Sequence, residues 1–326
     1  MGSGRPRTTA SATLVAALLS GLVLAALAGC KSTPKAPPPS PSAPAAPGGD
    51  SWAPPATAPA AATTQVKPFF FRAEKGGHAL YLLGTIHVGV DALTELPPWV
   101  LAQLDAAPAF AMETDLSDPA TVQLLVRTDG KTLAAELGDA DWERLRQALG
   151  PALADGMNSM KPFAALSALS LKDLPMTAPM DMTLLNRAKT AGKRLVYLEP
   201  VADQLAAIEP YATAADIKAL LDHAAEAKAD TLKMVTAYRA GDAAGLKAMF
   251  DDKTLWIAAG RDPARFGDFI EATLGKRNRS WVPHLVAMAD AGGGFVAVGA
   301  GHLVGPENVP DLLTAAGFTV TPVTGP

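Results

Sequence analysis

The amino-acid sequence predicts an α/β fold, with a central, mostly parallel sheet, helices on both faces and a helical cap. Four short apolar runs without strict polar alternation are typical of strands covered on both faces. They lie at 79–85, 109–114, 194–199 and 294–300. The segments between them have helical periodicity, and two of them, 116–179 and 201–291, are longer than crossovers need to be. We therefore expect these two segments to build the cap as well as the crossovers.

Weaker patterns in the sequence predict two further strands and the helices between the strands. Residues 67–74 predict a strand that pairs with the run at 79–85 through a turn at Gly76-Gly77, and 317–323 predicts a last strand. Helices are predicted at 141–149, at 180–194 with its end at Gly192, from 201–208 onward, at 211–250 with a break at Gly241-Asp242, and at 308–317.

The first thirty residues have the pattern of an export signal. Arg5 and Arg7 precede a continuous apolar stretch, 14–30, that ends in small residues. Its last four residues, "LAGC", resemble a bacterial lipobox, which implies cleavage after Gly29 and acylation of Cys30. The alternative is an ordinary signal peptide with a chance cysteine. The sequence thus predicts a lipoprotein signal peptide over 1–29 and attachment to a membrane through the lipid on Cys30.

Residues 30–66 are predicted to be the lipidated cysteine followed by an extended tether. Pro, Ala, Ser and Thr dominate this segment, so it cannot bury enough apolar surface to fold. The folded domain would then comprise 67–326. We therefore expect a lipid-anchored protein of the cell envelope. Because Lys31 rather than an aspartate follows the cysteine, in a host with two membranes it would sit in the outer one, facing the periplasm or the exterior.

Cysteine content and charge exclude several classes of protein. Cys30 is the only cysteine in the chain, which excludes internal disulfides, a thiolate nucleophile and a cysteine-based metal site in the folded part. Without the first thirty residues two arginines are lost and the formal net charge changes from −4 to −6. Such a charge argues against a nucleic-acid partner, which requires a basic face. The sequence also lacks a G-x-S-x-G elbow and a P-loop, which disfavours serine-hydrolase chemistry and nucleotide binding.

Each of the four strong strands is followed by a side chain that can bind a ligand or transfer a proton. His87 follows the first strand, Glu113 the second, Glu199 the third and His302 the fourth. Sites in open α/β sheets lie beyond the carboxyl ends of the strands, so these four side chains are expected to converge. Both histidines share the spacing Gly-x-x-His, with glycine where the chain must leave the sheet sharply.

This residue set fits two kinds of chemistry. Imidazoles and carboxylates are ligands for Zn, Mn or Co, and a metal with an open position activates water. A glutamate that is not a ligand would then serve as general base. The same set also fits hydrolysis without a metal, in which a histidine activates water and a glutamate orients it. The alternative is structural, because buried carboxylates often cap a helix or pair with an arginine.

A further candidate is the stretch "LGKRNRSW", which contains Arg277 and Asn278. On a helix, these two side chains would bring a cation and an amide to an anionic substrate or an oxyanion. The alternative is a solvated basic face. His78 is predicted to be a turn residue, and His223 and His284 are predicted to be surface or core residues.

Six motifs together resemble the TraB/GumN family. They are "YLLGTIHVG", "AMETD", "KPFAALSAL", "YLEPVADQL", "RNRSW" and "VGAGHLVGPENVPDLLTAAGF", in the family's order between about residues 68 and 322. The opening and closing motifs are the most specific. The family is related to the TIKI metalloproteases and, more distantly, to erythromycin esterase and the haem-binding lipoprotein ChaN.

The resemblance implies an α/β core like that of erythromycin esterase and ChaN, with a site assembled from the matching positions. These are His87, Glu113, Glu199, Arg277, Asn278 and His302. Asp181 matches a family aspartate that opens a helix. One motif departs from the family: its usual "LET-x-EEQL" reads "LEPVADQL" here, which keeps Glu199 but alters the turn after it.

The relatives imply three functions. TIKI-like members imply metal-dependent peptide hydrolysis, the esterase branch implies hydrolysis without a required metal, and ChaN implies binding without catalysis. We expect an envelope-anchored, metal-dependent peptidase that acts on a peptide or a small molecule. His87, His302, Glu113 and Glu199 would supply the ligands of a divalent metal (Zn, Mn or Co) and the base, and Arg277 would stabilise developing negative charge. The alternative is a non-catalytic lipoprotein that binds haem or another small ligand through one of the histidines.

Overall fold

The computed structural model of the chain describes residues 65–115, 117–118, 120–174 and 177–326. The predicted signal peptide, Cys30 and nearly all of the predicted tether lie outside these residues. In the described part, no helix is both long enough and apolar enough to cross a membrane. Val66, at the predicted end of the tether, is only 2% exposed and donates its N–H to the Glu95 carbonyl at 2.9 Å. The chain therefore packs against the domain from this residue onward.

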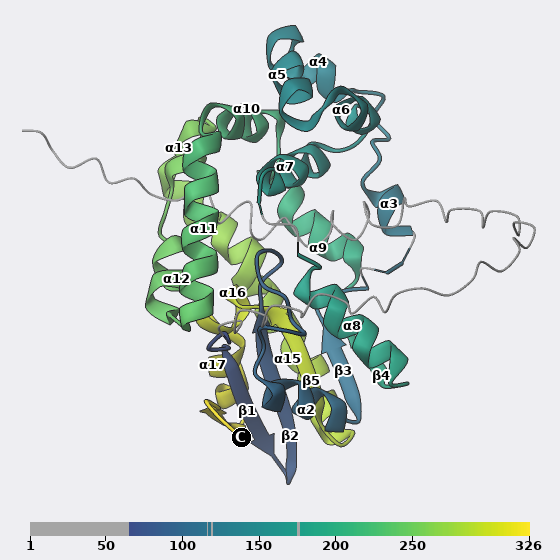
Figure 1. Cartoon of the computed structure of the whole chain (residues 1–326), viewed down its shortest axis with the longest axis vertical. Helices are drawn as coiled ribbons and strands as arrows, with labels where there is room; N and C mark the ends of the chain where they lie inside the picture. Colours follow the sequence, from purple (N-terminus) through teal and green to yellow (C-terminus); the bar gives the residue numbers. More distant parts are fainter. Residues whose placement is uncertain (1–64, 116, 119, 175–176) are drawn as a thin grey trace, which may run out of the picture.

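Six strands form one mixed sheet in the order β4-β3-β5-β2-β1-β6 (Figure 1). They are β1 (Phe70–Lys75), β2 (His78–Thr85), β3 (Ala109–Met112), β4 (Arg194–Tyr197), β5 (Gly294–Gly299) and β6 (Thr319–Pro322). The four strands β2, β5, β3 and β4 pair in parallel, whereas β1 pairs antiparallel with β2 and β6. The predicted α/β class and mostly parallel sheet are confirmed, and the carboxyl ends of the four parallel strands meet at one edge.

The first two strands form the predicted hairpin. Lys75 pairs with His78, and Gly76 and Gly77 occupy the two turn positions with φ of 61° and 82°. Two consecutive positive φ angles match the twist of a two-residue hairpin, and glycine adopts them without steric cost. The hairpin adds β1 beside β2, so that β2 is an interior strand.

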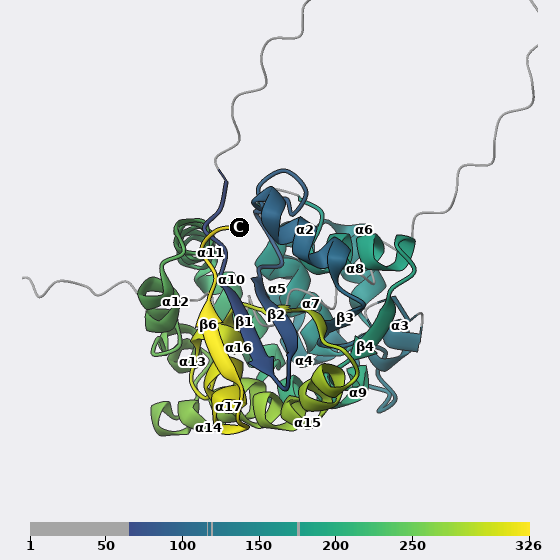
Figure 2. The same cartoon turned by 90° about the horizontal axis from the view of Figure 1, so that it is seen from below.

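Helices cover both faces of the sheet. Along β5, Phe295 and Ala297 pack into one apolar cluster, and Val296 and Val298 pack into another on the opposite face. Helices α2 and α8 contribute to the first cluster, and α15 and α17 contribute to the second. Their bounds are Pro98–Ala106 (α2), Met180–Thr190 (α8), Lys276–Asp290 (α15) and Val309–Ala315 (α17). Figure 2 shows the two helix pairs on opposite sides of the sheet. Burial on both sides explains why β5 is apolar throughout.

A helical cap lies over the carboxyl edge of the sheet (Figure 1). As predicted, it is built from the two long crossovers. The first contains α3 (Ala120–Leu124), α4 (Leu133–Leu137), α5 (Asp139–Leu149), α6 (Pro151–Met157) and α7 (Pro162–Leu171). The second contains α9 (Val201–Ile208), α10 (Ala214–Asp222), α11 (Ala224–Ala240), α12 (Ala243–Met249), α13 (Thr254–Ala258) and α14 (Phe266–Ile270), with 3₁₀ turns at Glu209–Tyr211 and Pro263–Arg265. The cap has its own apolar core, which includes Phe163 of α7 and Ile217 of α10.

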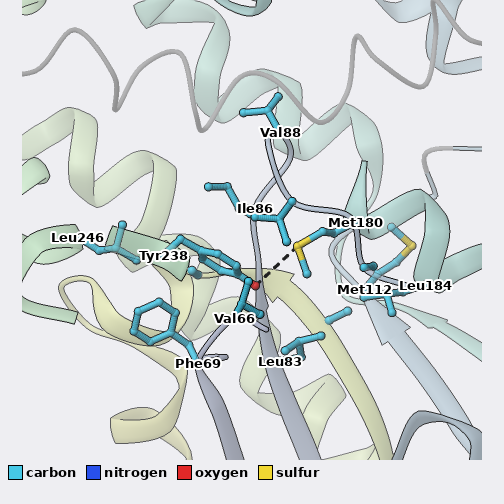
Figure 3. Packing of buried hydrophobic residues seen from close by; sticks show 14 of the residues in the cluster. Val66, Phe69, Leu83, Ile86, Val88, Met112, Met180, Leu184, Tyr238 and Leu246 are labelled. Carbon is cyan, nitrogen blue, oxygen red and sulfur yellow. Dashed lines mark hydrogen bonds between the residues drawn. The ribbon is translucent and has the colours of Figure 1, made fainter. Parts of the chain in front are cut away.

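Tyr238 of α11 joins the cap to the end of β2 (Figure 3). Its hydroxyl donates to the Gly84 carbonyl at 2.7 Å and lies 3.6 Å from Met180 Sδ. The ring packs against Phe69, with 5.8 Å between the centroids. Burial raises the pKa of Tyr238, so that the hydroxyl stays protonated and remains a donor. The strand end that leads to His87 is therefore held by the cap.

A substitution at Gly84 measures how tightly this strand end is packed. A Cβ at this position would lie 3.0 Å from Ala300 Cα and 3.1 Å from Phe69 Cβ. Because both neighbours are held by backbone hydrogen bonds to this strand, we expect Gly84→Ala to lower the free energy of unfolding by about 1–3 kcal/mol. The matched control is Gly156→Ala in α6, where a Cβ would meet nothing within 4 Å.

Chemical denaturation of the two alanine variants measures both effects. The Gly156 change is expected to stabilise the protein by about 0.5–1 kcal/mol, because alanine favours a helix over glycine. Equal stability of the two variants would contradict this account of β2.

Candidate functional site

The edge formed by the parallel strands brings the predicted site residues together. His87 follows β2, Glu113 follows β3 and Glu199 follows β4, while His302 lies in α16, the short helix after β5. The bounds of α16 are Gly301–Val304. Arg277, the second residue of α15, reaches this edge from the helix layer. The predicted convergence of residues that lie up to 215 positions apart is therefore present in the fold.

Arg277 lies at the centre of the site and is 5% exposed. Its Nη2 donates to Glu113 Oε2 at 2.7 Å and also to Glu199, and its Nε donates to Glu199 Oε1 at 2.9 Å. Its Nη1 donates to the Thr273 carbonyl at 2.9 Å and lies 3.3 Å from His302 Nε2. All five N–H bonds of the guanidinium therefore have an acceptor.

The helical turn before Arg277 holds its side chain in place. Residues Glu271–Gly275 form a π-helix (η3), and Thr273, whose carbonyl accepts from Arg277, lies inside it. Such π-helical turns are frequent at functional sites because they change which carbonyls remain available. One turn later, the Trp281 ring lies 5.0 Å from the guanidinium carbon. The sequence gives no signal for the π-helix.

With every N–H engaged, Arg277 acts on the site through its charge. Burial alone would lower the pKa of Arg277, but Glu113 and Glu199 raise it above its ordinary value. The guanidinium is therefore a permanent cation beside the predicted reaction centre. Its effect on developing negative charge is electrostatic, because no N–H remains to donate to an oxyanion in this arrangement.

The two glutamates bound to Arg277 have different acidities. Burial would raise the pKa of Glu113, but the nearby His302 and Arg277 and the Gly299 N–H at 2.8 Å lower it to about 2. The opposite holds for Glu199, because burial raises its pKa above the ordinary value in spite of Arg277. Glu113 therefore remains ionised at neutral pH, and Glu199 is the less acidic carboxyl group of the pair.

The ring of His302 is held by Asn278. Asn278 Nδ2 donates to the Glu307 carbonyl at 2.9 Å, which orients its Oδ1 toward His302 Nδ1 at 2.5 Å. Nδ1 therefore carries the proton, and Nε2 presents a lone pair to Arg277 and to Glu113 Oε1, which lies 3.6 Å away. Burial, together with Arg277 and His87, lowers the pKa of His302 to about 3. His302 is thus a neutral imidazole at physiological pH.

His87 forms a pair with Asp181 of α8. The two side chains are joined by His87 Nδ1 and Asp181 Oδ2 at 2.8 Å, and Thr85 Oγ1 donates to the other carboxylate oxygen at 2.6 Å. Burial would lower the pKa of His87, but the charge and hydrogen bond of Asp181 raise it above its ordinary value. Within the described part of the chain, Nε2 of His87 has no hydrogen-bond partner. This is the arrangement of a histidine general base with its orienting carboxylate.

A cavity of about 80 Å3 lies between the sheet edge and the cap. Of the predicted residues, His87, Glu113, Arg277 and His302 line it. Glu199 and Asn278 do not line it but lie behind Arg277 and His302 and position them. Their polar atoms contact Arg277, His302 and the Glu307 carbonyl, and their predicted catalytic roles stay predictions.

Three of the four predicted metal ligands contact a guanidinium, and the fourth, His87, pairs with Asp181. Glu113, Glu199 and His302 all point toward Arg277, which carries the positive charge at their common position. Among the described residues, no three His, Asp or Glu side chains are arranged to hold a metal ion. The donor set as arranged therefore does not fit a metal, and metal binding stays a prediction from the resemblance.

The cavity volume also bears on the haem alternative. The cavity has a volume of about 80 Å3, which is well below the ~300–1,000 Å3 typical of pockets for larger ligands. The haem alternative therefore gains no support from the cavity and also stays a prediction.

Several residues of the site were not predicted to belong to it. Gln204, which donates to Glu113 Oε2 at 2.8 Å, and Thr85, which donates to Asp181, lie within the quoted motifs but were given no role. Asp181 was marked only by the resemblance, although an acidic residue in the first turn of α8 was a visible cue. Its pairing with His87 depends on the distance across the sheet edge, which the sequence does not encode locally.

The chain is thus an α/β protein with a helical cap. Its polar site lies at the sheet edge, where two glutamates and two histidines surround an arginine. The family model for the TraB/PrgY/gumN family matches residues 69–322, and the chain belongs to this family. The resemblance noted in the sequence motifs is thereby confirmed. Neither the comparison with curated proteins nor the comparison with solved structures gave a match.

Proposed function

We propose that this member of the family is a hydrolase in which His87 activates water without a metal. The observation that carries the proposal is the His87–Asp181 pair, joined at 2.8 Å beside a cavity that also contains Glu113 and Arg277. A histidine whose Nδ1 is bound by a carboxylate keeps Nε2 available to accept a proton. Arg277 supplies the positive charge that a metal would otherwise supply.

The proposed reaction is hydrolysis of a carbonyl compound, either an ester or an amide. His87 Nε2 accepts a proton from water while the water oxygen forms a bond to the carbonyl carbon, and Glu113 orients that water. The resulting imidazolium then donates its proton to the leaving alcohol or amine as the C–O or C–N bond breaks. Arg277 stabilises the negative charge on the intermediate through its field, which is strong in a buried site.

The metal-dependent peptidase predicted from the sequence is the second candidate. One observation favours it: a histidine that is bound at Nδ1 by a carboxylate, as His87 is by Asp181, is typical of metal ligands. It requires His302 and a glutamate to exchange their contacts with Arg277 for a metal. We therefore place it after the metal-free hydrolase.

Assays with and without metal separate the two candidates. The purified protein would be tested on short esters and on a peptide library, first after treatment with a chelator and then after addition of Zn, Mn or Co. We expect ester hydrolysis that persists after chelation, together with no stoichiometric metal by elemental analysis. Peptide cleavage that requires an added metal would support the second candidate, and no cleavage of any substrate would refute both.

Anchoring at the cell envelope is a proposal that depends on the sequence alone. Its support is the "LAGC" pattern that ends at Cys30, followed by the segment rich in proline and alanine. Such a tether would hold the folded domain away from the membrane surface.

A further inference from the structure

The cavity beside His87 has two chemically different sides. The sheet edge contributes the polar groups, His87, Glu113, Arg277 and His302. The cap contributes an apolar wall that consists of Leu171, Leu174, Met234, Leu246, Met249 and Phe250. These wall residues come from α7, α11, α12 and the residues just after α7 and α12.

Among the described residues that line the cavity, none on the cap side is charged. The polar cap residues that line it are Ser170, Thr231 and Tyr238, and each hydroxyl donates to a backbone carbonyl. Their hydrogen atoms are therefore engaged and do not offer a donor to a substrate. A charged or strongly polar substrate group on this side would lose its hydration without gaining a partner, whereas an alkyl group would be stabilised.

The volume limits the size of this alkyl group. A cavity of about 150 Å3 holds benzene, which has six heavy atoms. In proportion, the volume of about 80 Å3 found here holds about three to four heavy atoms. In the proposed reaction the substrate carbonyl lies toward His87 and the alkyl carbons lie toward the cap. Acyl groups of about two to four carbon atoms then fill this space.

We propose that the substrate is an ester or amide of a short, uncharged acyl group, and that Met234 and Met249 form the wall that sets its length. This inference rests on the proposed hydrolase, because it assigns the acyl side of that reaction to the cap. Each CH2 that enters the apolar side should improve kcat/KM about fourfold until the wall is reached, after which the rate falls.

The first experiment measures hydrolysis of ethyl esters from acetate to octanoate by the purified full chain. We expect the highest kcat/KM for acyl groups of two to four carbons and a value at least tenfold lower for octanoate. Met249→Ala should shift the optimum toward longer chains. The matched control is Met157→Ala, which truncates a buried methionine of the cap that does not line the cavity and should leave the optimum unchanged.

The second experiment measures binding without turnover. Acetamide, butyramide and octanamide are titrated into protein labelled with carbon-13 at the methionine methyl groups, and the methyl NMR signals are followed. We expect butyramide to shift the signals of Met234 and Met249, and not that of Met157. Octanamide should produce much smaller shifts at the same concentration.

The two experiments distinguish failure of this inference from failure of the proposed function. Shifts at the wall methionines without hydrolysis of any ester would support the short acyl site and refute the hydrolase. Hydrolysis of octanoate as fast as butyrate, or no shift at Met234 and Met249 with butyramide, would overturn the short acyl site. A shifted optimum in Met157→Ala would also overturn it, because the effect would then not arise from the wall.

Discussion

Replacing His87 by alanine is expected to lower kcat/KM for ester hydrolysis by about 10²–10⁴, the usual contribution of a general base. The fold should tolerate this change, because the side chain is 18% exposed and bonds only to Asp181 within the described residues. The control is His284→Ala, which changes an exposed histidine on α15 and should leave the activity unchanged. Activity retained in the His87 variant would refute the proposed mechanism.

The pH dependence tests the role of Asp181 in the same pair. The base form of His87 is required, so kcat/KM should rise with pH through the pKa of His87, which lies above its ordinary value. In Asp181→Asn the carboxylate charge that raises this pKa is removed. The rising part of the profile should therefore move to lower pH, together with a lower maximal rate. A profile that moves to higher pH, or does not move, would show that Asp181 does not act through His87.

Replacing Arg277 by methionine is expected to give the largest loss of stability, about 3–5 kcal/mol. The change leaves the buried Glu199 and the partly buried Glu113 beside each other without their common cation, and an uncompensated charge out of solvent is costly. Denaturant unfolding at pH 7 measures the loss. Combining Arg277→Met with Glu113→Gln and Glu199→Gln should recover part of it, because the buried negative charges are then removed as well.

The matched control for Arg277 lies two residues further along the same helix. Arg279 is exposed and pairs with Glu271 and Glu307 at the surface, where solvent screens ion pairs. Arg279→Met should therefore leave the unfolding midpoint nearly unchanged. Equal effects at the two arginines, or no recovery in the triple variant, would contradict the central role of Arg277.

The strands and the strand-end residues could be predicted because their signals are local. A strand that is covered on both faces is apolar at every position, and β5 therefore stands out in the sequence. The parallel direction of four such strands places their carboxyl ends at one edge, so His87, Glu113, Glu199 and His302 were expected to converge. The hairpin was predictable from two glycines, which adopt the positive φ angles that the turn requires.

The roles within the site could not be predicted in the same way. Whether a buried carboxylate binds a metal or an arginine depends on which cation lies closest in three dimensions, and Arg277 is 78 positions away from Glu199. From the sequence, pairing of these carboxylates with an arginine was only the structural alternative, and this pairing is present. The apolar wall was equally hidden, because Met234 and Met249 have the same pattern as any core residue of a helix.

The sequence by itself determined the fold class, the family and the four strand ends that carry the site, because periodicity, glycine positions and motif order are local properties of the chain. The tertiary structure decided that Glu199 contacts Arg277 and Asn278 contacts His302, that Asp181 pairs with His87, and that Arg277 lies between Glu113 and Glu199. These outcomes require residues that are far apart in the chain to come within hydrogen-bonding distance of each other. Such distances are set only when the cap and both helix layers have packed against the sheet.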